Sequence, residues 1–241
     1  MLDTKAWYAS RMTTRAEVTP NRRGVKSREL VLDAAERVMA EHGYDGASVA
    51  RVVEEAGIPL SSVYHYFGSK DGILLAVMER GAERFFAELP QPLERTGSSR
   101  QHLEAMTSTL IEALGRHPNF LRLLIVFATQ PPAAGNGEVR AVVSRVRATA
   151  LERLRQQLSL AYGDDPEDPT VEQLARFGLA AIDGAFVASQ TDQNAPLKAT
   201  LLPWAASLDA LRATLNRRGS SQTPTRPTVD ARTRTASRAR R

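Results

Sequence analysis

Two short helical segments joined by a tight turn occupy residues 48–67, and this pattern constrains the fold more than any other feature of the chain. Apolar side chains repeat at helical spacing after Ser48, which is itself a favoured N-cap residue. Gly57 permits the backbone to leave the first helix, and Pro59 suits the first turn of the second, where a missing N–H costs little. The spacing predicts a helix-turn-helix unit.

The second helix of this unit is short and carries hydroxyl groups and an imidazole on its expected outer face. A polar helix of this kind, braced by another helix, suits the major groove of DNA. The residues that we expect to contact DNA are Ser48, Leu60, Ser61, Ser62, Tyr64, His65, Tyr66 and Lys70.

A further helix is expected to begin at Ser69, which can cap its N-terminus. Free N–H groups and the helix dipole favour an anion there, and the ammonium group of Lys70 stands beside them. We therefore expect Lys70 and Tyr64 to contact phosphates. The residues expected nearest the base edges are Leu60, Ser61, Ser62 and His65.

Residues 27–43 predict the helix that supports this unit, and Gly43 is its expected stop signal. Apolar residues recur at helical spacing along one face of this segment. The expected inward face comprises Leu30, Val31, Ala34, Ala35, Val38 and Met39.

Residues 28–75 resemble the DNA-binding domain of the tetracycline-repressor-type (TetR-like) transcriptional regulators. The matching segments share one ungapped register: His42-Gly43-Tyr44, Ser48-Val49, Ala56-Gly57-Ile58, Val63-Tyr64-His65-Tyr66-Phe67 and Ser69-Lys70-Asp71. Leu60 and Ser61 depart from the family pattern, which often has a polar residue and glycine there, so the operator sequence does not follow. The rest of the helical chain resembles the family's ligand-binding and dimerisation domain in size and pattern only.

Helices are expected beyond residue 75 as well, because no stretch shows sustained strand alternation and Gly and Pro cut the chain into helix-length pieces. We predict an all-α fold with an N-terminal three-helix helix-turn-helix DNA-binding domain at residues 28–75. A C-terminal helical ligand-binding and dimerisation domain is expected at residues 76–217. Residues 1–27 are expected to form a flexible basic arm, either touching DNA or simply solvated, and residues 218–241 a disordered Arg-rich tail.

The net charge of +5 is unevenly distributed. Residues 1–28 carry +5 and residues 217–241 carry +7, whereas residues 29–216 carry −7. Attraction to DNA therefore has to come from a local face of the helical body or from its basic ends.

Enzymatic readings find little support in the sequence. Its four histidines lack metal-ligand spacing, it contains no cysteine, and no nucleophile elbow, P-loop or dinucleotide fingerprint occurs. We expect no catalysis, no metal and no cofactor. No long apolar run or secretory signal is evident, so we expect a cytoplasmic protein without a membrane span. A helical protein-interaction module without sequence-specific DNA binding is the alternative.

A second binding site is predicted in the C-terminal part, around a segment at residues 120–127 that is apolar nearly all round. Such a site favours an apolar or aromatic small-molecule effector, and Asp183 would orient a polar or cationic group. Aromatic residues at helical spacing also fit plain core packing. The candidate wall residues are Phe85, Met106, Phe120, Leu124, Phe127, Phe177 and Asp183.

The last two expected helices, at residues 170–191 and 196–217, carry a large apolar surface that suits a homodimer interface or internal core packing. The residues proposed for this interface are Phe186, Trp204 and Leu208. The family resemblance implies a four-helix bundle on a two-fold axis and a palindromic double-stranded DNA operator. It also implies a repressor that an effector releases by tilting the helix at residues 70–89.

Overall fold

The computed structural model describes residues 22–89, 97–130 and 137–221, and every regular element in these ranges is a helix. The all-α prediction is confirmed. The helices are α2 (Arg22–Gly46), α3 (Val49–Ala56), α4 (Leu60–Phe67), α5 (Lys70–Glu88), α6 (Ser99–Arg116), α7 (Pro118–Thr129), α8 (Gly137–Tyr162), α9 (Pro169–Thr191), α10 (Leu197–Leu201) and α11 (Trp204–Ser221).

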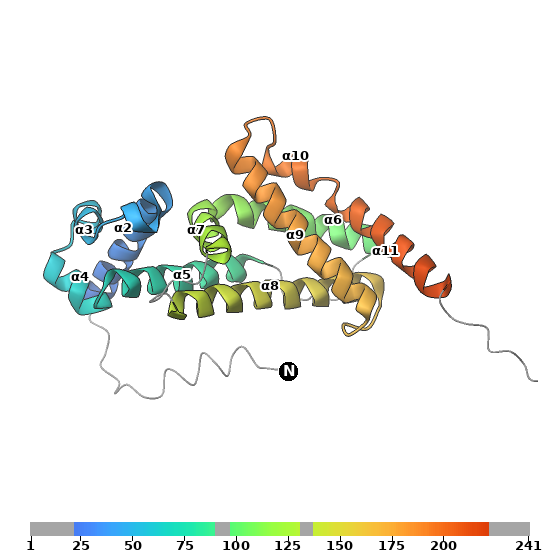
Figure 1. Ribbon diagram of the computed structural model, residues 1–241, viewed down its shortest axis with the longest axis horizontal. Helices are drawn as coiled ribbons and strands as arrows, with labels where there is room; N and C mark the ends of the chain where they lie inside the picture. Colours follow the sequence, from blue (N-terminus) through green and yellow to red (C-terminus); the bar gives the residue numbers. More distant parts are fainter. Residues whose placement is uncertain (1–21, 90–96, 131–136, 222–241) are drawn as a thin grey trace, which may run out of the picture.

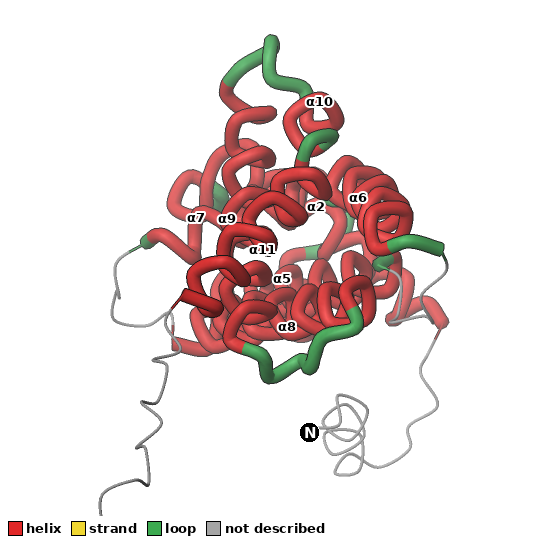
Figure 2. Tube along the Cα trace, turned by 90° about the vertical axis from the view of Figure 1, so that its right-hand side faces the viewer, coloured by secondary structure: helices red, strands yellow, loops and turns green. Residues whose placement is uncertain are grey.

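The helices form a small N-terminal unit and a longer bundle that α5 joins together (Figure 1). Helices α2, α3 and α4 pack on one another at one end of the molecule. From there α5 runs beside α8, and α9 and α11 pack above this pair with α6 (Figures 1 and 2). One helix, α5, therefore contacts both the N-terminal unit and the bundle.

The helix boundaries of the N-terminal unit follow local sequence signals. The Ser48 hydroxyl caps α3 by accepting from the N–H of Arg51 at 3.2 Å, and Gly57 ends this helix in the left-handed conformation with φ 63°. Ser69 caps α5 by accepting from the N–H of Gly72 at 3.0 Å. These caps confirm the sequence predictions for all three residues.

The supporting helix α2 differs from expectation at both ends. It begins at Arg22, so residues 22–27 form its first turns rather than part of a flexible arm; residues 1–21 lie outside the described residues. Gly43 interrupts it with φ 71°, as expected of a stop signal, but helical turns continue to Gly46. Leu30 is 41% exposed, because the contacts with α3, α5 and α7 cover the neighbouring face of α2 instead.

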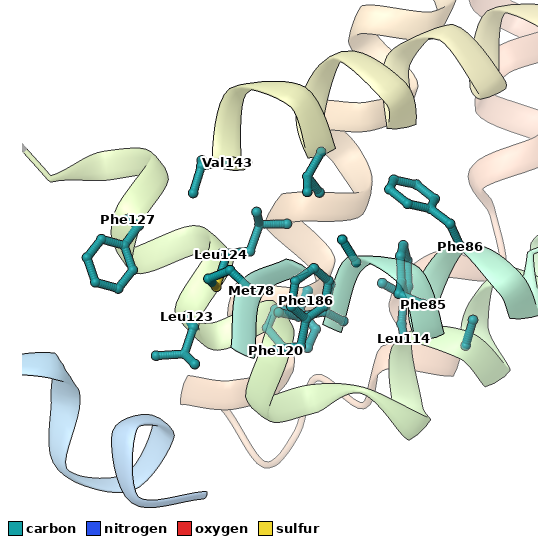
Figure 3. Packing of buried hydrophobic residues seen from close by; sticks show 14 of the residues in the cluster. Met78, Phe85, Phe86, Leu114, Phe120, Leu123, Leu124, Phe127, Val143 and Phe186 are labelled. Atoms are coloured by element: carbon teal, nitrogen blue, oxygen red, sulfur yellow. The ribbon is translucent and has the colours of Figure 1, made fainter. Parts of the chain in front are cut away.

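A continuous hydrophobic core fills the bundle (Figure 3). Phe120 of α7 is completely buried and lies against Gly81 of α5. A Cβ atom on Gly81 would stand 2.3 Å from Cδ2 of Phe120, so α5 and α7 can approach this closely only because residue 81 lacks a side chain. Phe85 and Phe86 continue the same aromatic cluster toward the end of α5.

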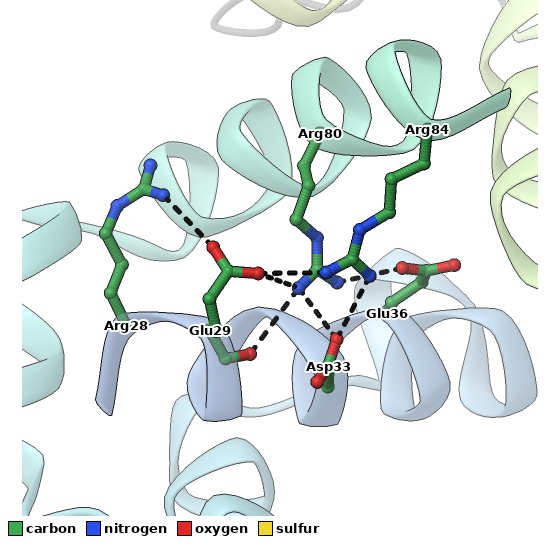
Figure 4. A network of polar contacts seen from close by, with 6 residues as sticks. All are labelled: Arg28, Glu29, Asp33, Glu36, Arg80 and Arg84. Atoms are coloured by element: carbon green, nitrogen blue, oxygen red, sulfur yellow. Dashed lines mark hydrogen bonds and ion pairs between the residues drawn. The ribbon is translucent and has the colours of Figure 1, made fainter. Parts of the chain in front are cut away.

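A cluster of ion pairs joins α5 to α2 (Figure 4). The Arg80 guanidinium, 8% exposed, donates to Glu29 at 3.1 Å, to Asp33 at 2.7 Å and to Glu36 at 2.9 Å. Arg84, 48% exposed, also pairs with Glu29 and Asp33. Three carboxylates thus gather around one buried cation, which holds the N-terminal unit against the connecting helix.

The Arg80→Ala substitution should lower the free energy of unfolding by about 3 kcal/mol, because it leaves three carboxylates facing one another at a partly buried joint. The Arg84→Ala substitution is the matched control and should cost less than about 1 kcal/mol, because Arg84 is half exposed to solvent. Urea unfolding of both variants measures the difference. Equal losses would show that burial of Arg80 adds nothing to its ion pairs.

Candidate functional site

The outer face of α4 is exposed to solvent. Val63 is completely buried and anchors the helix to the rest of the N-terminal unit. Leu60 and Tyr64 are 48% and 47% exposed. The exposed side chains of α4 are Leu60, Ser61, Tyr64 and His65, all of which were predicted to contact DNA.

Three of the remaining predicted contact residues lie at the margins of this face. The Ser48 hydroxyl is exposed and already accepts the capping hydrogen bond of α3, while Ser62 is half-buried. Tyr66 lines a hollow of about 470 Å³ together with Arg28 and Glu138, so it faces the start of α8. Helical geometry turns Tyr66 away from the exposed side chains two residues before it.

Lys70 is held in place at the start of α5. Its Nζ lies 4.3 Å from the ring centroid of Tyr44 and donates to the backbone carbonyl O of Asp45 at 3.4 Å. The Tyr44 hydroxyl donates to Asp71, and burial together with this carboxylate raises the pKa of Tyr44, so the phenol keeps its proton. The ammonium group therefore stands beside the capped N-terminus of α5, where a phosphate would meet donors and positive charge together.

A cavity of about 110 Å³ lies in the bundle, with walls from α5, α6, α7, α8 and α9. Most of its lining is aliphatic or aromatic. Four of the predicted wall residues line it: Phe85, Met106, Leu124 and Asp183. These four residues come from α5, α6, α7 and α9 and form part of the cavity wall.

The other three predicted wall residues lie elsewhere. Phe120 is buried against Gly81, where it fills the contact between α5 and α7. Phe127 packs edge-on against Tyr44 at 5.8 Å and so joins α7 to the N-terminal unit. Phe177 is 46% exposed on α9. All three were wrong as wall residues, because helical spacing alone does not reveal which neighbour a side chain meets.

The polar groups of the cavity come mainly from α8. Arg147 forms two hydrogen bonds with Asp183, at 2.6 and 3.2 Å, so this carboxylate already has a cationic partner. Arg153 donates to the backbone carbonyl O of Phe86 at 2.8 Å, and Oε1 of Gln157 lies 3.0 Å from Nε2 of His102.

The sequence analysis missed these α8 groups because arginines on a long amphipathic helix usually face solvent. The contacts of α8 with α5, α6, α7 and α9 turn them inward instead. A signal was present: Arg147, Arg153 and Gln157 stand beside buried apolar positions of the helix.

The three residues predicted for the dimer interface are buried inside the chain itself. Phe186 and Trp204 are each 3% exposed and Leu208 is fully buried. Nε1 of Trp204 donates to the backbone carbonyl O of Gly178 at 3.1 Å, between α11 and α9. These side chains therefore form the internal packing that was the alternative, and they offer a partner no free surface.

Two other features bear on the class of site. Within residues 22–89, 97–130 and 137–221, no three His, Cys, Asp or Glu side chains gather as a metal site would require. None of the helices in those same ranges has the length and apolar character needed to cross a membrane.

The N-terminal unit matches a known family, and the whole fold matches solved structures. Residues 31–77 match the model for bacterial regulatory proteins of the tetR family. The HTH-type transcriptional repressor AcnR of Corynebacterium efficiens is 42% identical over 60 residues, which are 25% of this chain and 32% of that protein. The chain therefore spans about a third of the length of this relative.

Among solved structures, a tetR-family transcriptional regulator from Streptomyces coelicolor superposes with a TM-score of 0.65 at 18% identity, covering 81% of this chain and 85% of that one. SmeT, the repressor of the Stenotrophomonas maltophilia multidrug efflux pump SmeDEF, gives a TM-score of 0.58 at 22% identity, over 78% and 89% of the two chains. SmeT has also been solved in complex with triclosan. At these identities the likeness shows the fold.

The Ser69→Ala substitution should lower the free energy of unfolding by about 1 kcal/mol, because it removes the cap of α5. Ser61→Ala is the control, since Ser61 is exposed within α4 and caps no helix. Thermal unfolding of the two variants tests this. A loss for Ser61→Ala as large as that for Ser69→Ala would contradict the role of the cap.

Proposed function

We propose that this chain, whose residues 31–77 match the model for bacterial regulatory proteins of the tetR family, is a ligand-responsive transcriptional repressor that binds a palindromic operator as a homodimer. The exposed face of α4, braced by α3 and followed by Lys70 at the capped start of α5, is the observation that carries this proposal. The proposed division of the chain places DNA binding in residues 28–75 and effector binding and dimerisation in residues 76–217.

In the proposed complex, α4 enters the major groove with Leu60, Ser61 and His65 toward the base edges. The exposed hydroxyls can donate or accept there, and Leu60 can contact a thymine methyl group. Tyr64 and Lys70 contact phosphates, which fixes the register without reading sequence. The net negative charge of the helical body makes this local cation important.

The proposed dimer uses the outer face of α9 rather than its buried aromatic residues. Phe177 and Val187 are 46% and 42% exposed, and Ala180 and Gly184 lie between them on the same face. A Cβ atom on Gly184 would meet nothing within 4 Å, so the face is open for close approach of another helix. A two-fold dimer would present two copies of α4 to half-sites one helical turn apart, roughly 34–36 Å.

The proposed switch depends on the cavity beside α5. An effector in that cavity touches Phe85 and Phe86 near the end of α5, while Arg80 ties the same helix to α2. A displacement of α5 would therefore move the N-terminal unit. The SmeT–triclosan complex supports this reading, because a protein of the same fold holds a small aromatic molecule. An inducer must bind the DNA-free conformation more tightly than the DNA-bound one. Operator DNA must then weaken inducer binding by the same factor by which the inducer weakens DNA binding.

Binding of the purified protein to the region upstream of its own gene tests the proposed function, with a scrambled duplex of equal length as competitor. Fluorescence anisotropy should show specific binding that the competitor does not displace. Affinity that is equal for both duplexes would contradict a sequence-specific regulator and favour the protein-interaction alternative.

The Lys70→Ala substitution should weaken DNA binding about equally for every sequence and lower the salt slope by about one unit, because it removes one phosphate contact. Lys198→Ala is the control, since this exposed lysine lies on α10, which packs on α9 and α6 and stands apart from α4 (Figure 1). Anisotropy titrations at several salt concentrations give both quantities. An unchanged slope for Lys70→Ala would remove Lys70 from the interface.

The Phe177→Glu substitution should weaken the dimer by about 2 kcal/mol or more without unfolding the chain, because Phe177 lies outside the core. Val25→Glu, which replaces another exposed apolar residue on α2, is the control and should leave the dimer intact. Sedimentation velocity distinguishes the two states. A Phe177→Glu protein that remains a dimer of full affinity would place the interface elsewhere.

A further inference from the structure

Arg153 is a cation on the cavity wall without a carboxylate partner. Among the described residues, no Asp or Glu oxygen lies within 4.0 Å of its guanidinium, whereas Arg147 and Arg155 of the same helix both form ion pairs. Its hydrogen-bond acceptor is a neutral group, the backbone carbonyl O of Phe86. Its Cζ also lies 4.8 Å from the centroid of the Phe86 ring.

The surroundings of Arg153 compensate its charge only in part. Burial lowers the pKa of the guanidinium, and no acidic side chain opposes that effect. The face of an aromatic ring and a carbonyl at the C-terminal end of a helix both attract a cation, but neither carries a full negative charge. A half-buried cation in an apolar cavity is costly unless an anion joins it.

The charges of the cavity lining point the same way. The lining contains two arginines and one aspartate, and its other members are uncharged, so the wall carries a net charge of +1. Asp183 is already engaged by Arg147. The expectation that Asp183 would hold a cationic group is therefore replaced by the opposite one, in which the unmatched charge of the wall is positive.

We propose that the effector of this cavity is a small amphipathic carboxylate, whose anionic end pairs with Arg153 and whose apolar body lies against Phe85, Met106 and Leu124. The guanidinium keeps donors for a carboxylate, since the hydrogen bond to Phe86 occupies only Nη1. A cavity of about 110 Å³ limits the apolar body to about one ring at most, because the cavity known to hold benzene is larger, at roughly 150 Å³.

The carboxylate site rests on the proposed function only in that the bound molecule is taken to regulate DNA binding. The site also suggests how a bound molecule could act on α5. Phe86 stands in the last turn of α5, where backbone carbonyls lack partners within the helix. Arg153 supplies one of the missing donors. A carboxylate that draws on the same guanidinium would act directly on the end of the helix that leads to the N-terminal unit.

Three isosteric probes test the sign of the charge: benzoate, benzamide and benzamidine, titrated calorimetrically into the full-length protein in chloride-free buffer. Benzoate should bind at least tenfold more tightly than benzamide, and benzamidine should bind more weakly than benzamide. Benzoate binding no tighter than benzamide, or no binding of any probe at millimolar concentration, would overturn the proposal.

Variants assign the effect to Arg153. Arg153→Gln should cut benzoate affinity about tenfold and leave benzamide affinity within twofold. Arg145→Gln is the control, because Arg145 is 47% exposed on the same helix, beside Glu79, and should change neither affinity. A preference for benzoate that survives in Arg153→Gln would overturn the assignment.

A measurement without ligand separates binding from a purely structural role. If Arg153 is kept for an anion, Arg153→Met should leave the melting temperature of the free protein unchanged or raise it. Arg147→Met should lower it, because Asp183 would lose its partner. An equal drop in both variants would show that Arg153 serves the stability of the free protein as much as Arg147 does, and would overturn the proposal.

The operator assay keeps this inference separate from the proposed function. If the protein binds the upstream DNA specifically and is released by benzamide but not by benzoate, the proposal of a carboxylate effector is overturned and the proposed repressor function is kept. If benzoate binding depends on Arg153 but the protein does not bind the upstream DNA, the carboxylate site is supported and the proposed repressor function is contradicted.

Discussion

The contact between Arg80 and three carboxylates of α2 fixes how the N-terminal unit sits on the rest of the molecule. Apolar packing tolerates sliding, whereas a guanidinium that donates to Glu29, Asp33 and Glu36 satisfies all three only in one arrangement. These ion pairs between α2 and α5 also fix the orientation of the exposed face of α4, because α4 packs on both helices. Any change in the angle of α5 is therefore transmitted to the surface that would meet DNA.

The same helix, α5, meets a second arginine at its other end. Arg80 lies in its middle and faces α2, while the carbonyl of Phe86 near its end accepts from Arg153 of α8. Between them, Gly81 lets α7 approach so closely that Phe120 fills the space a side chain would need. Helix α5 is thus held by two directional contacts and one tight apolar contact, so it is suited to move as a rigid body rather than to bend.

Sequence reasoning succeeded where the signal was local and failed where it depended on a distant partner. Ser48, Gly57 and Ser69 act through groups a few residues away, so their roles could be deduced from spacing alone. Trp204 and Phe186 were assigned to an interface because α9 and α11 are rich in apolar residues, yet the fold turns these side chains into the chain's own core. Arg153 was missed for the converse reason. Its place beside apolar positions of α8 puts it near the buried side of the helix, but the contacts of α8 with four other helices are needed to show that it faces a cavity.

Helix α9 connects the two proposed activities of the C-terminal part. Its inner face contributes Leu179, Ile182 and Asp183 to the cavity, and its outer face presents Phe177 and Val187 to solvent. These positions alternate along the same turns, so a molecule bound inside lies one helix diameter from a partner bound outside. The proposed effector would consequently act along two routes. One runs through α5 to the orientation of each N-terminal unit, and the other through α9 to the distance between the two units of a dimer.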